Sequence, residues 1–456
     1  MEPSGAQMIL GLVLGVFVLI FLVLRTKVHA FLALIIAASI TGIVGGMKAP
    51  DVIDSITSGF GGTLGSIGIV IGFGVMMGRI LEISGAAERL AYTFIKWLGK
   101  RKEEWAMAIT GYVVSIPIFV DSAFVILTPL VKALSKKTGK SVVGLGVALG
   151  IGLAVTHHAV PPTPGPLGVA GIFGVDVGLM ILTGLIFAVP LMIIGIFYAK
   201  WVGKRIYQLP DEDGQGFVRP DVPKTLEEYY EMQEDKNLPS FLRSSLPILV
   251  PIFLIFLNTT IGAIGLEGGI YNILTFLGSP IIAVGIGLLF AIYGLFNHVK
   301  QSTAIERMEE GIKEAGIILL VTGAGGALGN VLRESGAGDY IAEQIAQTAL
   351  PAILLPFVIA SIVRLIQGSG TVAMITGASI SAPILAGLDV NMVLAAQAAT
   401  LGAMVFSYFN DSLFWVVNRM LGIKNVKEQI ITWSVPTTLV WAGSLVLLLI
   451  ANGIIG

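Results

Sequence analysis

The chain has no cysteine and few charged residues, and both shortages narrow what it can be. None of its 456 residues is cysteine, so disulfides and thiolate metal ligands are excluded. Charged residues make up 12% of the chain, which is about half the share in an average soluble protein. The net charge of −1 provides no basic surface for nucleic acid, and we expect no nucleic-acid partner.

Hydrophobic residues are abundant instead, at 55% of the chain. Many runs reach the roughly 18 apolar residues that cross about 30 Å of hydrocarbon, whereas the short alternating strands of an outer-membrane barrel are absent. The sequence therefore predicts an all-α polytopic membrane protein, embedded in the lipid bilayer of the cell (inner) membrane. The predicted spans are 8–25, 28–46, 61–83, 141–173, 177–199, 245–262, 279–297, 313–332, 388–421 and 430–453.

Two further apolar stretches, 105–131 and 350–385, do not fit as simple crossings. The first is flanked by KWLGKRKEE and KALSKKTGK, which are both basic, so the positive-inside rule places both flanks in the cytoplasm. The stretch must enter and leave by the same face, and each of its arms is long enough to reach only the middle of the bilayer. We predict a re-entrant hairpin here and a second one at 350–385.

The basic residues of the loops fall on one side of this arrangement. The first apolar run has no basic residue before it and is followed by Arg25 and Lys27, which is a poor pattern for a cleaved signal. Both termini are therefore predicted on the extracytoplasmic side. Residues 200–244 form the one sizeable polar loop, which we interpret as a cytoplasmic linker between membrane halves 1–199 and 245–456.

The two halves contain similar segments. GRILEISGAAERLA (78–91) and GNVLRESGAGDYIA (329–342) share six of 14 residues at an offset of 251. SAFVILT (122–128) resembles GTVAMIT (370–376) at the similar offset of 248. Chance similarity between apolar, glycine-rich segments is the alternative. Because each half has five crossings, an odd number, the second copy would be inverted relative to the first, as in many secondary transporters.

Four interruptions pair up under this repeat. The hairpins turn at IPIFVDSAF (116–124) and RLIQGSGTVA (364–373), and the spans after them break at VPPTPGPLG (160–168) and SYFNDSLFW (407–415). Proline inside a helix costs about 3 kcal/mol. Unwound backbone cannot face lipid, so it must line a cavity enclosed by protein. We therefore expect the breaks to expose backbone groups and half-helix ends to a solute near the middle of the bilayer.

Half-helix N-termini carry partial positive charge and unpaired amide donors, which suits an anion that also bears hydroxyl groups. For any single serine or threonine, helix capping or back-bonding is the plainer interpretation. No cofactor and no metal site is expected. The candidate substrate-binding residues are Ser122, Thr163, Gly165, Ser369, Gly370, Thr371, Asn410 and Ser412.

Ionisable groups at membrane depth are costly and often functional. Asp121 and Asp411 lie in a hairpin turn and a break, and two permanent charges would repel an anionic substrate. We predict that they carry the proton that drives transport, with His157 and His158 as further candidates because imidazole titrates near neutrality. A structural role remains open for each histidine, and Arg364 could offset a carboxylate or cap a helix. Sodium coupling also remains open.

Five motifs resemble the gluconate permease family, within the ion transporter superfamily. The resemblance implies proton symport of gluconate or a related sugar acid, and some members carry D-serine, glycerate or fructuronate. It also implies two inverted repeats of five transmembrane helices, elevator-type alternating access, and a homodimer. The motifs are SGAAERLA (84–91), IPIFVDSAFVILTPL (116–130), THHAVPPTPGP (156–166), QGSGTVA (367–373) and FNDSLFW (409–415).

Two other classes of protein, an intramembrane enzyme and a channel, fit the sequence less well than a transporter. An intramembrane protease would need a motif such as GxSxG or HExxH, and neither is present in the sequence. His157 and His158 are adjacent, so they cannot both face one metal from a regular helix. A channel would need a continuous pore, whereas four breaks that meet at one site favour alternating access.

Overall fold

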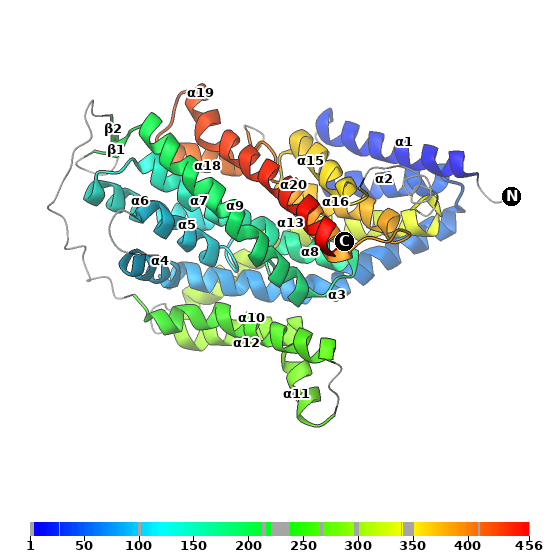
Figure 1. The fold of residues 1–456 in the computed structure, drawn as a ribbon. Coiled ribbons are helices and arrows are strands. Elements are labelled where there is room, and N and C mark those ends of the chain that lie inside the picture. Colours follow the sequence, from blue (N-terminus) through cyan, green and yellow to red (C-terminus); the bar gives the residue numbers. More distant parts are fainter. Residues whose placement is uncertain are drawn as a thin grey trace.

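The computed structural model describes residues 4–26, 28–98, 102–211, 216–219, 238–264, 268–295, 301–338, 340, 351–408 and 411–455. Apart from one short pair of strands, the elements are helices, which confirms the predicted all-α class (Figure 1). The first half contains α1 (Gly5–Leu24), α2 (Ala30–Val44), α3 (Ala49–Ile83), α4 (Ala86–Leu98), α5 (Glu103–Val114), α6 (Val120–Thr138), α7 (Val142–Ala159), α8 (Pro164–Phe173) and α9 (Val177–Arg205). The second contains α10 (Phe241–Ile264), α11 (Ile270–Leu277), α12 (Pro280–Leu295), α13 (Gln301–Glu334), α15 (Leu354–Gln367), α16 (Gly370–Leu385), α17 (Met392–Gly402), α18 (Ser412–Met420), α19 (Val426–Gln429), the π-helical η2 (Ile430–Ser434) and α20 (Val435–Ile455).

Within the described residues, six helical segments are long and apolar enough to cross a bilayer, and eight are if two bent pairs each count as one span. One of these bends, of 43°, divides α3 into Ala49–Gly65 and Gly68–Ile83. Two predicted spans are shorter than expected. Helix α2 has 15 residues and α17 has 11, and at about 1.5 Å per residue neither alone reaches across about 30 Å of hydrocarbon.

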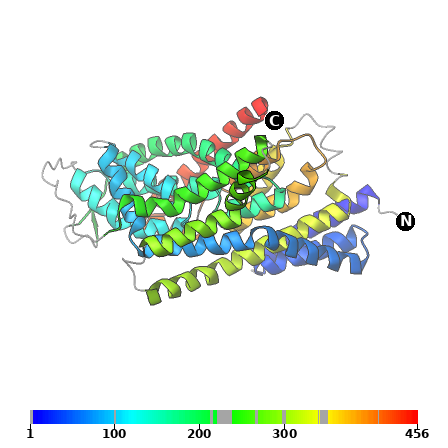
Figure 2. The same cartoon turned by 90° about the horizontal axis from the view of Figure 1, so that it is seen from below.

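The helices of the two halves pack in matching pairs. Helix α1 lies against α2, and α2 lies against α13; likewise α10 lies against α12, and α12 lies against α3. The long helices α3 and α13 pack against each other directly. Figure 2 shows the pair α10 and α12 nearest the viewer, on the opposite side of the molecule from α20. Both chain ends lie toward the end of the molecule away from the strand pair in both views (Figures 1 and 2).

Helix α7 lies at the centre of the largest hydrophobic core, and all 18 of its residues are buried. Its sequence explains this position, because VVGLGVALGIGLAVTHHA has no polar face to turn outward. Small residues let its neighbours come close. A Cβ added to Gly152 would lie 2.1 Å from the backbone oxygen of Ala108 on α5. The α5–α7 contact therefore depends on glycine where the two backbones meet.

The two predicted hairpins are helix–turn–helix pairs in the structure. In the first, α5 and α6 are joined by residues 115–119, and in the second, α15 and α16 are joined by residues 368 and 369. The turns are tighter than the motifs suggested. Asp121 and Ser122 already belong to the first turn of α6, and Arg364 lies in the last turn of α15.

Both predicted breaks are present, but their limits differ from the sequence prediction. The first covers only residues 160–163, because α8 starts at Pro164. A proline in the first turn of a helix costs nothing, since that amide has no partner within the helix, and therefore Pro164 and Pro166 start α8 rather than prevent it. The second break starts earlier than predicted, after Gly402, and α18 begins at Ser412.

The predicted linker 200–244 is helical at both ends in the structure. Helix α9 continues to Arg205 and α10 starts at Phe241, while strands β1 (Leu209–Pro210) and β2 (Phe217–Val218) pair antiparallel between them. Arg219, next to β2, binds both carboxylate oxygens of Glu428 at 2.8 and 2.7 Å. These hydrogen bonds lower the pKa of the Glu428 carboxyl. The strand pair is thereby tied to α19.

We expect Gly152→Ala to lower the free energy of unfolding by about 1–3 kcal/mol, because the new methyl group must push α5 away from α7. Thermal unfolding of the purified protein in detergent measures the change. Gly316→Ala on α13 is the matched control, since a Cβ there would meet nothing within 4 Å. Equal midpoints for the two variants would contradict the packing argument.

Candidate substrate site at the helix breaks

Each turn or break is followed by a helix whose N-terminus begins there. Helices α6 and α16 start after the hairpin turns, and α8 and α18 start after the breaks. Thr163 and Asp411, which the offset of 248 places opposite each other, are the N-cap residues of α8 and α18. The sequence pairing therefore matches two equivalent positions in the structure, both at the starts of half-helices.

A buried ion pair joins the second hairpin to the second break. Arg364 Nη2 on α15 lies 2.5 Å from Asp411 Oδ2, and the two side chains are 5% and 9% exposed. Asp411 also accepts hydrogen bonds from the Ser407 hydroxyl and, through Oδ1, from the Leu413 amide at 3.2 Å. The indole of Trp433 in η2 donates to the same Ser407 oxygen at 2.9 Å. Asp411 is thus held in place by three residues of the second half, and Trp433 supports it indirectly through Ser407.

The first hairpin also lies near the ion pair of Arg364 and Asp411. Asp121, in the first turn of α6, has the Ser412 hydroxyl in hydrogen-bonding position and lies within electrostatic reach of Asp411 and Arg364. Its Oδ1 atom is buried and has no hydrogen-bond partner among the described residues. The starts of α6 and α18 therefore meet, and they bring two carboxylates to one guanidinium.

The histidines connect the first break to the tip of the second hairpin. His158 is buried, and its Nδ1 atom lies 2.8 Å from the Ala154 carbonyl, so a neutral ring donates there and presents Nε2 as an acceptor. That Nε2 atom faces Gly370, where an added Cβ would lie 2.5 Å away, and no described residue pairs with it. His157 packs on Phe119, the residue before α6, with ring centroids 5.9 Å apart.

Some hydroxyl groups of the predicted serine and threonine residues form hydrogen bonds within the protein, and others do not. The Thr163 hydroxyl donates to the carbonyls of His157 and Val160 at 3.1 and 2.7 Å. Its hydrogen therefore stabilises the break and is not available to a substrate. Ser369 caps α16 by accepting from the Val372 amide at 3.3 Å. In the part of the chain that the structure describes, Ser122 and Thr371 have no hydrogen-bond partner. Their half-buried hydroxyls lie in the first turns of α6 and α16.

The other predicted residues have simpler surroundings. Gly165 provides space for Met374, whose sulfur would lie 2.6 Å from an added Cβ, so this glycine lets α8 and α16 pack closely. Asn410 lies outside the described residues. No group of three or more histidine, aspartate or glutamate side chains that could hold a metal occurs among the described residues.

Ser407 and Trp433 support the site but are not among the residues predicted from the sequence. Ser407 stands at the start of the quoted motif SYFNDSLFW, but a serine there has no feature that distinguishes it from a capping residue. Trp433 is fully buried and lies 26 residues from Ser407 along the chain. No local sequence pattern predicts this contact, because it depends on how η2 packs against the break.

The shared feature of this region is a set of buried polar atoms without partners. Such atoms are rare in folded proteins because each costs about 1–3 kcal/mol, and a bound ligand or water is the usual explanation. Here they include both donors and acceptors, and they come from α6, α7 and α15. The atoms are Asp121 Oδ1, His158 Nε2, Arg364 Nε and Arg364 Nη1.

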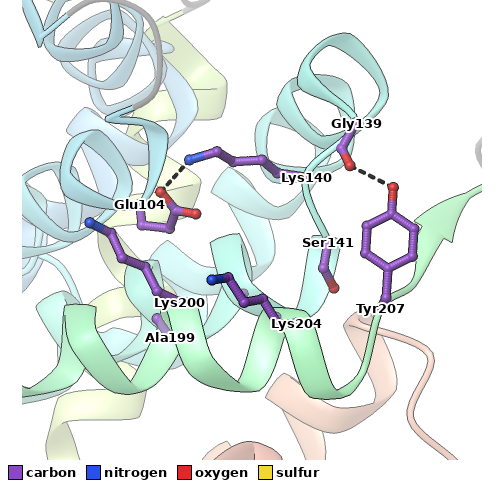
Figure 3. Close-up of a pocket in the computed structure, with 10 residues that line it drawn as sticks. Glu104, Gly139, Lys140, Ser141, Ala199, Lys200, Lys204 and Tyr207 are labelled. Atoms are coloured by element: carbon purple, nitrogen blue, oxygen red, sulfur yellow. Dashed lines mark hydrogen bonds and ion pairs between the residues drawn. The ribbon is translucent and has the colours of Figure 1, made fainter. Parts of the chain in front are cut away.

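A separate cavity of about 560 Å³ lies at the far end of α7 (Figure 3). Lys140 pairs there with Glu103 and Glu104 at 2.8 and 2.5 Å. Burial disfavours the Lys140 ammonium, but its hydrogen bonds to the two glutamates outweigh this and raise its pKa. The cavity adjoins Ser141, and the first break follows Ala159, about 27 Å further along α7. It therefore belongs to a different region from the breaks.

Comparisons with known proteins agree over nearly the whole chain. The profile of a family described as "GntP family permease" matches residues 7–454. An uncharacterized permease of Haemophilus influenzae is 58% identical over 98% of this chain and 93% of its own length. A gluconate permease of Pseudomonas aeruginosa is 33% identical over 98% of both chains. The structure of Neisseria gonorrhoeae MtrF, described as one of a class of antimetabolite efflux pumps, has a similar fold, with a TM-score of 0.66, 14% identity, and coverage of 96% and 97% of the two chains.

We predict that Arg364→Gln and Asp411→Asn each lower the free energy of unfolding by about 3–5 kcal/mol, because each leaves a buried charge without its partner. The double variant should be more stable than the sum of the two losses implies. Unfolding of purified protein in detergent micelles gives the four values of the double-mutant cycle.

The control cycle uses Arg219→Gln and Glu428→Gln, whose side chains are 46% and 28% exposed. Because solvent screens this pair, we expect a coupling of at most about 1 kcal/mol. Additive losses for the Arg364 and Asp411 variants would mean that the buried pair does not act as a unit.

Proposed function

The chain belongs to the GntP family of permeases, and from this premise we propose that it imports gluconate or a related sugar acid by proton symport. It is a multi-pass membrane transporter and not an enzyme. The observation that carries the proposed substrate class is the set of partnerless buried donors and acceptors where the breaks meet. A polyhydroxylated anion offers both kinds of complementary group.

The charges at this place support coupling to protons. Asp121 and Asp411 lie near one guanidinium, that of Arg364, so with neutral imidazoles the cluster carries a net charge of −1. An anionic substrate would raise this to −2 in a region shielded from water, where like charges repel strongly. Uptake of one proton by the aspartate pair returns the charge to −1. Binding of the proton would therefore increase the affinity for the anionic substrate, and binding of the substrate would increase the affinity for the proton.

We propose Asp121 as the main proton-binding group. Asp411 accepts three hydrogen bonds, one of them from its ion-pair partner Arg364, and all three favour its charged form. Asp121 has the Ser412 hydroxyl beside it but an unpaired Oδ1 atom. His157 and His158 are both buried, so we assign them to substrate contact and packing ahead of proton transfer.

The matching order of elements supports two inverted repeats and alternating access by an elevator movement. Among the described residues, α3 has a counterpart of the same kind in α13, and α5 to α9 have counterparts in α15 to α18 and α20. The packing partners exchange between halves: α8 lies on α16, and α18 lies on α6. The substrate would move with the hairpins and broken helices, while α3 and α13 belong to the static part. A homodimer and extracytoplasmic termini remain part of this proposal.

We expect Asp121→Asn to abolish accumulation of labelled gluconate driven by a proton gradient, because an amide cannot take up the coupled proton. Uptake into proteoliposomes with an imposed pH difference measures this. Asp51→Asn, at an exposed position in the first turn of α3, is the control and should transport normally. Full gradient-driven uptake by Asp121→Asn would remove this residue from the proton path.

A sodium-coupled carrier of another hydroxy acid or of D-serine is the alternative, since carboxylates and unwound carbonyls also suit sodium. We expect uptake to be unchanged when choline replaces sodium on both sides of the proteoliposome membrane, with the pH difference kept constant. Loss of uptake in choline would favour sodium coupling. Passage of gluconate without accumulation against its gradient would instead indicate a channel.

A further inference from the structure

Arg364 has far fewer hydrogen bonds than a buried arginine requires. A guanidinium has five N–H donors, and the Nε and Nη1 atoms carry three of them. Both atoms are buried and have no partner among the described residues, while Nη2 donates to Asp411. The side chain as a whole is 5% exposed, so bulk water does not replace the missing acceptors. An acceptor is therefore expected at this side chain when the protein is at work.

Arg364 lies beside the tip of the second hairpin, next to the candidate site. It occupies the last turn of α15, and Gly368 then ends the helix in a left-handed conformation with φ of 87°. The chain turns there into Ser369 and the start of α16, which faces His158. Asp411 fixes one corner of the guanidinium from the opposite break. The remaining donors are thus held in a fixed direction before any ligand arrives.

We infer that Arg364 receives the carboxylate of the substrate and so determines that this transporter takes acids and not neutral sugars. The inference rests on the proposed function and names the recognition element within that site. A carboxylate binds two parallel N–H groups along one edge of a guanidinium. Each edge of Arg364 has an unpaired donor, Nε on one and Nη1 on the other, and the second hydrogen of Nη2 completes the edge that Asp411 leaves free.

The other partnerless groups suit the rest of such a molecule. His158 Nε2 and Asp121 Oδ1 are acceptors, and the hydroxyls of Ser122 and Thr371 can donate or accept. A substrate that accepts at one end and donates hydroxyl hydrogens along its length would pair with all of them. Donors of Arg364 and acceptors of Asp121 and His158 would then bind different groups of the same acid.

The test compares gluconate with gluconamide, which keeps the hydroxyls and the shape but has no charge. Binding to purified protein is measured by titration calorimetry. Wild-type protein should bind gluconate and discriminate against gluconamide. We expect Arg364→Lys, which keeps the charge but loses the planar fork, to bind gluconate about 10- to 100-fold more weakly. Arg364→Gln should bind the two compounds equally.

Arg79→Gln is the matched control, because Arg79 is also largely buried and pairs with a carboxylate, that of Glu82 at 2.9 Å, on α3. It should keep the preference for gluconate. If Arg364→Gln fails to fold, the double variant Arg364→Gln with Asp411→Asn removes both charges and should also show no preference. If Arg364→Gln, alone or together with Asp411→Asn, still prefers gluconate, the inference is overturned and the proposed function is left standing. If folded wild-type protein binds no sugar acid, the proposed function fails as well.

Discussion

A helix that stops within a membrane leaves backbone groups that lipid cannot hydrogen-bond, and the architecture of this protein follows from that constraint. Helix α7 can end at Ala159 because its surroundings are protein on every side. Thr163 pairs with two of the released carbonyls, and Gln397 on α17 donates to the carbonyl of Ala159 at 3.1 Å. The break is thus supported partly by its own residues and partly by the other half of the chain.

The second break is supported differently, and the difference explains where chemistry can occur. It uses a charged residue, Asp411, as its helix cap, and a buried charge needs a partner. Arg364 supplies that partner from the hairpin, and Ser407 and Trp433 complete the surroundings. The first break is therefore supported by neutral groups, whereas the second carries ionised groups. This asymmetry gathers the ion pair at the second break.

The sequence was sufficient for the parts of the fold that depend on composition and on strong local signals. The all-α class, the two helix–turn–helix pairs and the two breaks follow from apolar runs interrupted by proline, glycine and polar residues. The limits of the first break were wrong because a proline signals a helix start as well as a helix end, and Pro164 does the former. The partners of Arg364 could not be read from the chain, since Asp411 is 47 residues away and its approach depends on tertiary packing.

Under the proposed function, the arrangement of α15 and α18 would also link substrate recognition to movement. Arg364 belongs to a hairpin and Asp411 to a broken helix, so the ion pair connects two segments that would line the same substrate. A carboxylate bound to Arg364 competes with Asp411 for the same cation, and protonation of the aspartate pair reduces that competition. The free energy of proton binding can then act on the contact between hairpin and break. Coupling needs no separate relay in this scheme, because one guanidinium is shared by the substrate and by the group that holds the break together.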